Sequence, residues 1–128
     1  MNASLFGRNP GLDVAFLNEA YANDAETAAY VFQMYLDELP TNLDLLNESL
    51  RNSDIERFRQ LIHKQKPGYS YVGLTDITAK LEELQVKCTV SDDLRAYKEE
   101  INEVLSRIHA SADLIERALN HLHQIKRA

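Results

Sequence analysis

Residues 91–122 read SDDLRAYKEEINEVLSRIHASADLIERALNHL and contain the clearest helical pattern in the chain. Apolar residues recur three or four positions apart through this stretch, as in a helix that packs one face into a core. They are Leu94, Tyr97, Ile101, Val104, Ile108, Ile115, Leu119 and Leu122. The pattern predicts a long helix capped by Ser91. The same period would suit a coiled-coil dimer, but a bundle core explains it as well, and we expect a monomer.

The rest of the chain repeats this spacing, interrupted by only four glycines and three prolines. The further predicted helices cover residues 12–22, 25–52 and 53–73, and a stretch that begins with Thr75 as its cap. Ser53 and Glu56 have the form of a capping box at the start of the third helix. Pro40 is expected to bend the second helix, and Pro67 to kink the third.

Helices of these lengths with short connections predict an all-α fold, an antiparallel four-helix bundle with an additional short N-terminal helix. With 128 residues, the chain is long enough for one hydrophobic core, and we expect residues 1–128 to form a single domain.

Composition narrows the classes of function. The net charge of −6 argues against sequence-independent nucleic-acid binding, which needs clustered lysine and arginine. No run of about 18 apolar residues is present, so no membrane span is expected and a cytoplasmic protein is the expectation. Cys88 is the single cysteine, which excludes an internal disulfide. No phosphate-binding glycine loop or kinase signature supports ATP binding.

His63 is the residue most suited to chemistry. The apolar residues of its helix fall on the face that points away from it, namely Phe58, Ile62, Tyr69 and Val72. His63 is therefore expected to be exposed. An exposed imidazole is largely neutral at pH 7, so one ring nitrogen keeps a lone pair that can attack phosphorus. Lys66, one turn later, would place an ammonium where it offsets charge on phosphoryl oxygens.

The other histidines do not suggest a metal site. His109, His121 and His123 lack the acidic residue three positions earlier that the Glu-x-x-His pattern of di-iron bundles requires. No His-Glu-x-x-His occurs either. We therefore expect no bound metal.

Residues 63–74, HKQKPGYSYVGL, resemble the signature of the histidine phosphotransfer (HPt) domain family. In that family the phosphoacceptor histidine is followed three residues later by a lysine, and ten residues later by a glycine ahead of another helix. His63, Lys66 and Gly73 match these positions. Residues 32–40, FQMYLDELP, are similar to the family's second-helix segment, and the five-helix order extends the resemblance to nearly the whole chain.

The resemblance implies that His63 accepts a phosphoryl group from a receiver-domain aspartate and relays it to another response regulator. It implies that Lys66 stabilises the phosphoryl group, and that the chain is a phosphocarrier rather than an ATP-dependent kinase. The implied partners are response regulator receiver domains and a hybrid sensor histidine kinase. The chain would need no cofactor of its own, because the receiver supplies magnesium. The expected docking and small-residue face consists of Gln60, Pro67, Gly68, Ser70 and Gly73.

Two residues depart from the family pattern. Pro67 stands where glycine is usual, and Gln65 stands where an apolar residue is usual. Gln65 falls on the apolar face, where its amide needs partners, so a bond to another helix is expected. These departures motivate an alternative function, a helical-bundle adaptor that binds a receiver or kinase without relaying phosphate. A receiver phosphatase that uses Gln60 or Gln65 to orient water is a third and weaker hypothesis.

Overall fold

The structure is a computed structural model that describes residues 5–7, 9–91 and 93–127. Its elements, in chain order, are α1 (Val14–Tyr21), α2 (Ala25–Arg51), α3 (Ile55–Tyr71), α4 (Thr75–Val90), the 3₁₀ turn η1 (Leu94–Tyr97) and α5 (Lys98–Arg127). The described residues contain no β-strand. The predicted all-α class is therefore confirmed.

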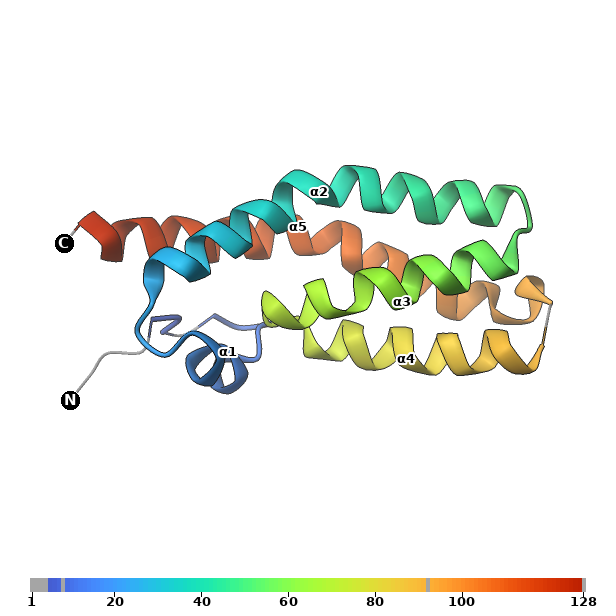
Figure 1. Ribbon diagram of the computed structural model, residues 1–128, viewed down its shortest axis with the longest axis horizontal. Helices are drawn as coiled ribbons and strands as arrows, with labels where there is room; N and C mark the ends of the chain where they lie inside the picture. The colour runs from blue at the N-terminus through green and yellow to red at the C-terminus, as the bar shows by residue number, and fades with distance from the viewer. Residues whose placement is uncertain (1–4, 8, 92, 128) are drawn as a thin grey trace.

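Four long helices form an antiparallel bundle, and the short α1 lies at one end of it (Figure 1). α2 packs against α5 and α3, and α4 packs against α3 and α5, so each long helix has two neighbours. Three-residue connections at 52–54 and 72–74 reverse the chain between α2, α3 and α4. The predicted four-helix bundle with an additional short N-terminal helix is confirmed.

The start of α1 is attached to the turn between α3 and α4. The backbone N–H of Asp13 donates to the carbonyl of Gly73 over 2.8 Å. The hydroxyl of Thr75 donates to the Asp13 carboxylate over 3.0 Å. At the other end of α1, the hydroxyl of Tyr21 donates to the carbonyl of Tyr71 over 2.6 Å. These bonds place α1 across the end of the α3–α4 pair.

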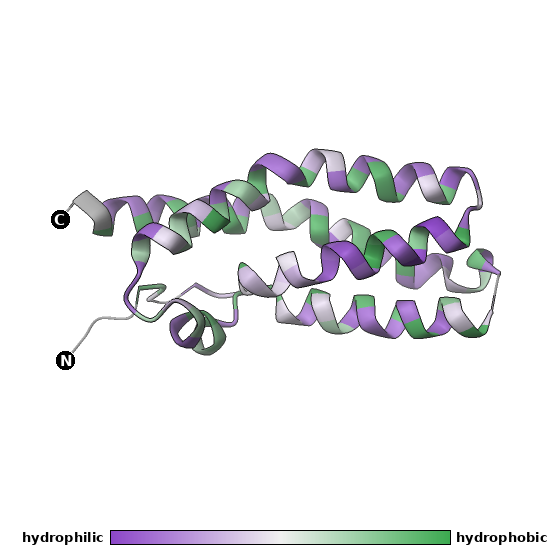
Figure 2. Ribbon diagram, in the orientation of Figure 1, coloured by the Kyte–Doolittle hydropathy of each residue, from purple (hydrophilic) through white to green (hydrophobic). Residues whose placement is uncertain are grey.

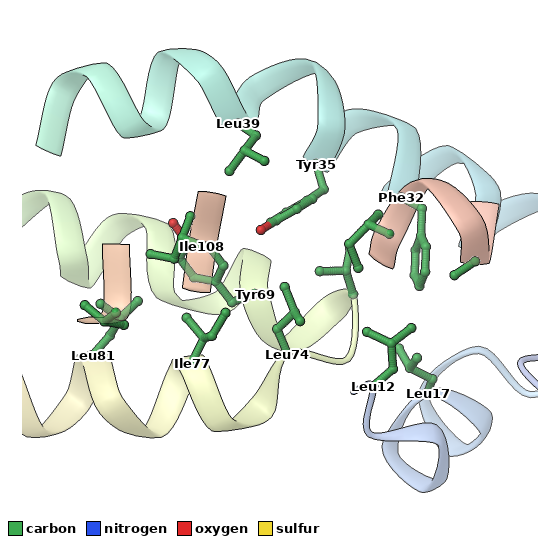
Figure 3. Packing of buried hydrophobic residues seen from close by; sticks show 14 of the residues in the cluster. Leu12, Leu17, Phe32, Tyr35, Leu39, Tyr69, Leu74, Ile77, Leu81 and Ile108 are labelled. Atoms are coloured by element: carbon green, nitrogen blue, oxygen red, sulfur yellow. The ribbon is translucent and has the colours of Figure 1, made fainter. Parts of the chain in front are cut away.

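The core runs along the inside of the bundle, where the long helices turn their apolar faces toward one another (Figure 2). In Figure 3, side chains from α2, α3 and α4 meet those of α5 and of the α1 region. Tyr35 and Tyr69 pack edge to face with ring centroids 5.8 Å apart. Tyr35 also forms a 2.6 Å hydrogen bond with Ser111, so its buried hydroxyl has a partner.

The start of α3 differs from the prediction. Asp54, and not Ser53, is the capping residue, because its carboxylate accepts from the backbone N–H of Arg57 over 3.0 Å. Ser53 adopts a φ of 52° in the preceding turn. Glu56 forms an ion pair with Arg59. The predicted capping box is therefore wrong, since the turn that reverses the chain places the residue after Ser53 at the cap.

Two other predicted caps are also wrong. α4 begins at Thr75, and its cap is Leu74, whose side chain has no acceptor, so α4 has no side-chain capping bond. The hydroxyl of Thr75 instead donates to Asp13 of the α1 region. Ser91 ends α4, and Asp93 caps η1, which precedes α5. The predicted last helix is therefore divided into a 3₁₀ turn and a long α-helix.

Both internal prolines lie within continuous helices. α2 runs through Pro40, and Figure 1 shows it changing direction partway along its length, in agreement with the predicted bend. α3 runs through Pro67 to Tyr71. Because proline has no backbone N–H, Pro67 cannot donate the usual helical bond to the carbonyl of His63, four residues earlier.

Candidate functional site

His63 lies on α3 and is exposed, whereas its neighbours Leu61 and Ile62 are buried in the core. Tyr69 and Val72, also predicted on the opposite face, are buried as well. The predicted exposure of His63 is therefore confirmed, and a second macromolecule can reach the imidazole.

Two polar side chains, one from α3 and one from α4, lie beside this imidazole. The amide nitrogen of Gln85 lies 3.2 Å from Nδ1 of His63. The amide oxygen of Gln85 accepts a 3.3 Å hydrogen bond from Nζ of Lys66. The predicted pair, His63 and Lys66, is thus joined through a residue of the next helix. For Nε2 of His63, no hydrogen bond occurs among the described residues, so this nitrogen is the one open to a reactant.

Lys66 also has an acidic neighbour. Its ammonium lies 3.5 Å from a carboxylate oxygen of Glu82 on α4. Lys66 is largely covered, with 20% of its side chain exposed, whereas Glu82 is 61% exposed. The lysine charge is therefore held close to the surface of α4, about one helical turn from His63.

The contacts between α3 and α4 follow one register. His63 and Gln85 each lie eleven residues from Leu74, the last residue of the turn between these helices. Lys66 and Glu82 each lie eight residues from Leu74. Ser70 and Thr78, four residues from it, share a 2.8 Å hydrogen bond between hydroxyls. Gln85, Glu82 and Thr78 were not among the predicted site residues, although their symmetry about the turn is a signal that points to them.

The remaining predicted site residues occupy three settings. Gln60 is exposed one turn before His63, and its amide donates to Glu56 over 3.4 Å. Pro67 and Gly68 are exposed one turn after it, and a Cβ built on Gly68 would meet nothing within 4 Å. Gly73 is buried in the α3–α4 turn, and so the structure does not place it on the exposed face.

Gln65 forms the predicted bond to another helix. Its amide nitrogen donates to the carbonyl of Asn42 on α2 over 3.3 Å. Its amide oxygen accepts from the hydroxyl of Tyr69 over 3.1 Å. Burial raises the pKa of Tyr69, which keeps this hydroxyl protonated as a donor. The departure from an apolar residue is therefore accommodated by a bond across to α2.

A groove of about 260 Å³ runs between α2 and α3, on the other side of α3 from Gln85. Exposed apolar surface in the groove comes from Met34 and Tyr71, which are 40% and 53% exposed. Arg57 and Lys64 add positive charge, and Glu38 adds negative charge. The groove thus offers a partner both apolar and charged contacts next to the helix that carries His63.

Other chemistry has little support in the described residues. They include no group of three or more histidine, cysteine, aspartate or glutamate side chains that could hold a metal ion. Cys88 is buried, and burial raises the pKa of its thiol, which disfavours the reactive thiolate. None of the helices in the described ranges combines the length and apolar character needed to cross a membrane.

Comparisons with models of known protein families, with curated proteins and with solved structures found no match for this chain.

Proposed function

We propose that this chain is a histidine phosphotransfer protein in which His63 accepts a phosphoryl group from a receiver-domain aspartate and passes it to another receiver. The observation that carries the proposal is the group formed by His63, Gln85 and Lys66. An exposed imidazole has its Nδ1 held by an amide, its Nε2 open, and an ammonium bonded to the same amide. These are the groups that a phosphocarrier needs from its own chain.

The proposed reaction is an in-line transfer to the open ring nitrogen. The lone pair of Nε2 forms a bond to phosphorus while the bond between phosphorus and the aspartate oxygen breaks. The aspartate leaves as a carboxylate and keeps the electron pair of the broken bond. Lys66 offsets negative charge on the phosphoryl oxygens. Return of the group to a second receiver reverses these steps.

The surroundings of His63 support docking of a folded partner. Pro67 and Gly68 project little from the helix surface one turn after the histidine. The α2–α3 groove supplies Met34 and Tyr71 as exposed apolar contacts. Exposed apolar groups with charged residues beside them are typical of protein-binding surfaces. The proposed partners are therefore receiver domains and the hybrid kinase that contains one.

The direct test is the intact mass of the purified protein after treatment with phosphoramidate or with a phosphorylated receiver. We expect one phosphoryl adduct that is stable at neutral pH, labile in acid and absent from His63→Gln. His109→Gln, which removes an exposed histidine of α5, is the matched control and should retain the adduct. A folded protein that forms no adduct with either donor would instead support the non-relaying adaptor.

A second test separates the role of Lys66 from docking. Lys66→Ala should lower the rate of transfer from a phosphorylated receiver more than it weakens receiver binding, because its charge acts on the phosphoryl oxygens. Single-turnover transfer and binding of the unphosphorylated receiver would be measured side by side. Equal losses in rate and affinity would contradict the electrostatic role.

A further inference from the structure

The contacts of Gln85 fix the orientation of its amide. An ammonium can only donate hydrogen bonds, so the group that faces Lys66 at 3.3 Å must be the amide oxygen. The amide NH₂ then faces Nδ1 of His63 at 3.2 Å. Because this NH₂ can only donate, Nδ1 must accept and therefore carries no proton. Lys66 thus determines, through Gln85, the protonation pattern of the histidine ring.

This pattern has a consequence for the reaction. A neutral imidazole carries one proton, so a proton-free Nδ1 places that proton on Nε2. The exposed Nε2 then has no lone pair for attack on phosphorus. The nitrogen that has the lone pair is Nδ1, which faces Gln85. The resting arrangement therefore holds His63 in the tautomer that cannot react at its open nitrogen.

We propose that Gln85 is a positioning residue that switches His63 between two tautomers by turning its amide over, and that this rotation releases Lys66. The inference rests on the proposed phosphotransfer at Nε2. In the turned orientation the amide oxygen accepts from Nδ1–H, and Nε2 gains the lone pair. The amide NH₂ now faces Lys66, where two donors cannot bond, so the ammonium leaves Gln85.

The released ammonium has a position from which to act. Glu82, 3.5 Å from Nζ of Lys66, still holds the lysine near the site after the bond to Gln85 is broken. During transfer, Nε2 bonds to phosphorus, the aspartate leaves as a carboxylate, and the ring retains its Nδ1 proton. The Gln85 oxygen then accepts from a positively charged ring, and Lys66 moves toward the phosphoryl oxygens. The turn of the Gln85 amide and the release of Lys66 favour each other, because the bond between Lys66 and Gln85 exists only in the resting orientation of the amide.

The test reads the tautomer directly, by long-range ¹H–¹⁵N correlation spectra of the full chain at a pH of about 8.5, where exposed imidazoles are neutral. His109 is the internal reference, because it is exposed and has no side-chain hydrogen bond in the described part of the chain. We expect the ratio of Nε2–H to Nδ1–H in His63 to exceed that of His109 by roughly two- to tenfold, as one net hydrogen bond allows. An equal ratio, or an excess of Nδ1–H in His63, would overturn the inference.

Two variants test the coupling to Lys66. In Lys66→Met the amide is free to turn, so the Nδ1–H fraction of His63 should rise roughly two- to fivefold, as expected for loss of one polar contact at a partly exposed site. Lys80→Met removes the same charge from α4, where Lys80 pairs with Glu83, and should leave the ratio unchanged. If the Nδ1–H fraction of His63 does not rise in Lys66→Met, or rises equally in both variants, the coupling between Lys66 and the His63 tautomer is refuted.

The adduct experiment keeps this inference distinct from the proposed function. If His63 forms the adduct but its tautomer ratio matches that of His109, phosphotransfer stands and the switch is wrong. If the ratio is shifted as expected but no adduct forms, the hydrogen bonding is as described and phosphotransfer is wrong, and the switch then has no reaction to serve.

Discussion

Replacing Gly73 with alanine tests whether this glycine is needed for the fold or for an exposed binding face. Gly73 has a φ of 82°, a conformation that costs an L-residue roughly 1–2 kcal/mol. A Cβ at this position would lie 2.7 Å from Cδ1 and 3.1 Å from Cγ of Leu17, and 3.4 Å from the backbone nitrogen of Asp13. Overpacking of this kind costs about 1–3 kcal/mol. The two effects together predict a loss of roughly 2–5 kcal/mol in the free energy of unfolding.

The assay is thermal and urea unfolding followed by circular dichroism at 222 nm. For a chain of 128 residues, 1 kcal/mol corresponds to a Tm change of about 4 °C, so Tm should fall by about 8–20 °C. Gly68→Ala is the matched control, because Gly68 is exposed within α3 and a new Cβ there meets nothing within 4 Å. Alanine is the better helix former, and this variant should gain about 0.5–1 kcal/mol.

The same variant tests whether Gly73 takes part in phosphorylation of His63. At a temperature where Gly73→Ala remains folded, its adduct yield with phosphoramidate should equal that of the unchanged protein, because Gly73 is buried. The variant Leu17→Ala removes the two side-chain atoms that lie nearest to the new Cβ, so both substitutions together should cost less than the sum of their separate losses. A Gly73→Ala protein as stable as the parent, or a stable one that forms no adduct, would refute the structural role.

Three further substitutions test individual hydrogen bonds by urea unfolding. Burial raises the pKa of Tyr35 to about 12, so the unfolded state loses this proton near pH 10 while the native state keeps it. The free energy of unfolding that Tyr35 contributes below pH 10 is therefore lost as the pH rises toward 12. Between pH 9 and 11, the free energy of unfolding should fall by about 1 kcal/mol more in the parent than in Tyr35→Phe. Equal losses in the two proteins would contradict this. Gln65→Leu should lower the free energy of unfolding by about 1–3 kcal/mol, because it leaves the Tyr69 hydroxyl unpaired. Adding Tyr69→Phe should recover part of this loss. Additive losses would argue against the hydrogen bond between Gln65 and Tyr69. Asp13→Ala should lower the free energy of unfolding by about 1–2 kcal/mol, because it removes the N-cap of α1 and the acceptor for Thr75. A loss below about 0.5 kcal/mol, which is typical of an ordinary surface substitution, would show that α1 is held by packing alone.

The sequence was sufficient to predict the helices and the exposed histidine, because both follow from one periodicity. The apolar stripe of α5 is buried from Ile101 to Leu122 as predicted, and the opposite face of α3 leaves His63 exposed. The predicted caps were wrong at Ser53, Thr75 and Ser91, where the hydrogen bonds depend on the turn or on α1 rather than on local sequence. Short-range patterns do not contain this information.

The candidate site was predicted only for its α3 half. His63 and Lys66 could be paired because they lie on one helix, three residues apart. Gln85 and Glu82 come from α4, and no residue pattern within α4 marks them as partners of α3. Their recognition requires the register of two packed helices, which depends on the length of the turn as well as on the two apolar faces.

The register of α3 and α4 also limits where the chain can tolerate a change in length. The three cross-helix pairs lie four, eight and eleven residues on either side of Leu74. One residue inserted into the first turn of α4, between Thr75 and Thr78, would advance every later α4 side chain by about 100° around its helix relative to α3. The residues opposite His63 and Lys66 would then change together, although Lys66 and His63 lie nine and twelve residues before Thr75. A change in length at the start of α4 is therefore expected to separate His63 and Lys66 from their partners on α4, even where the helix itself still forms.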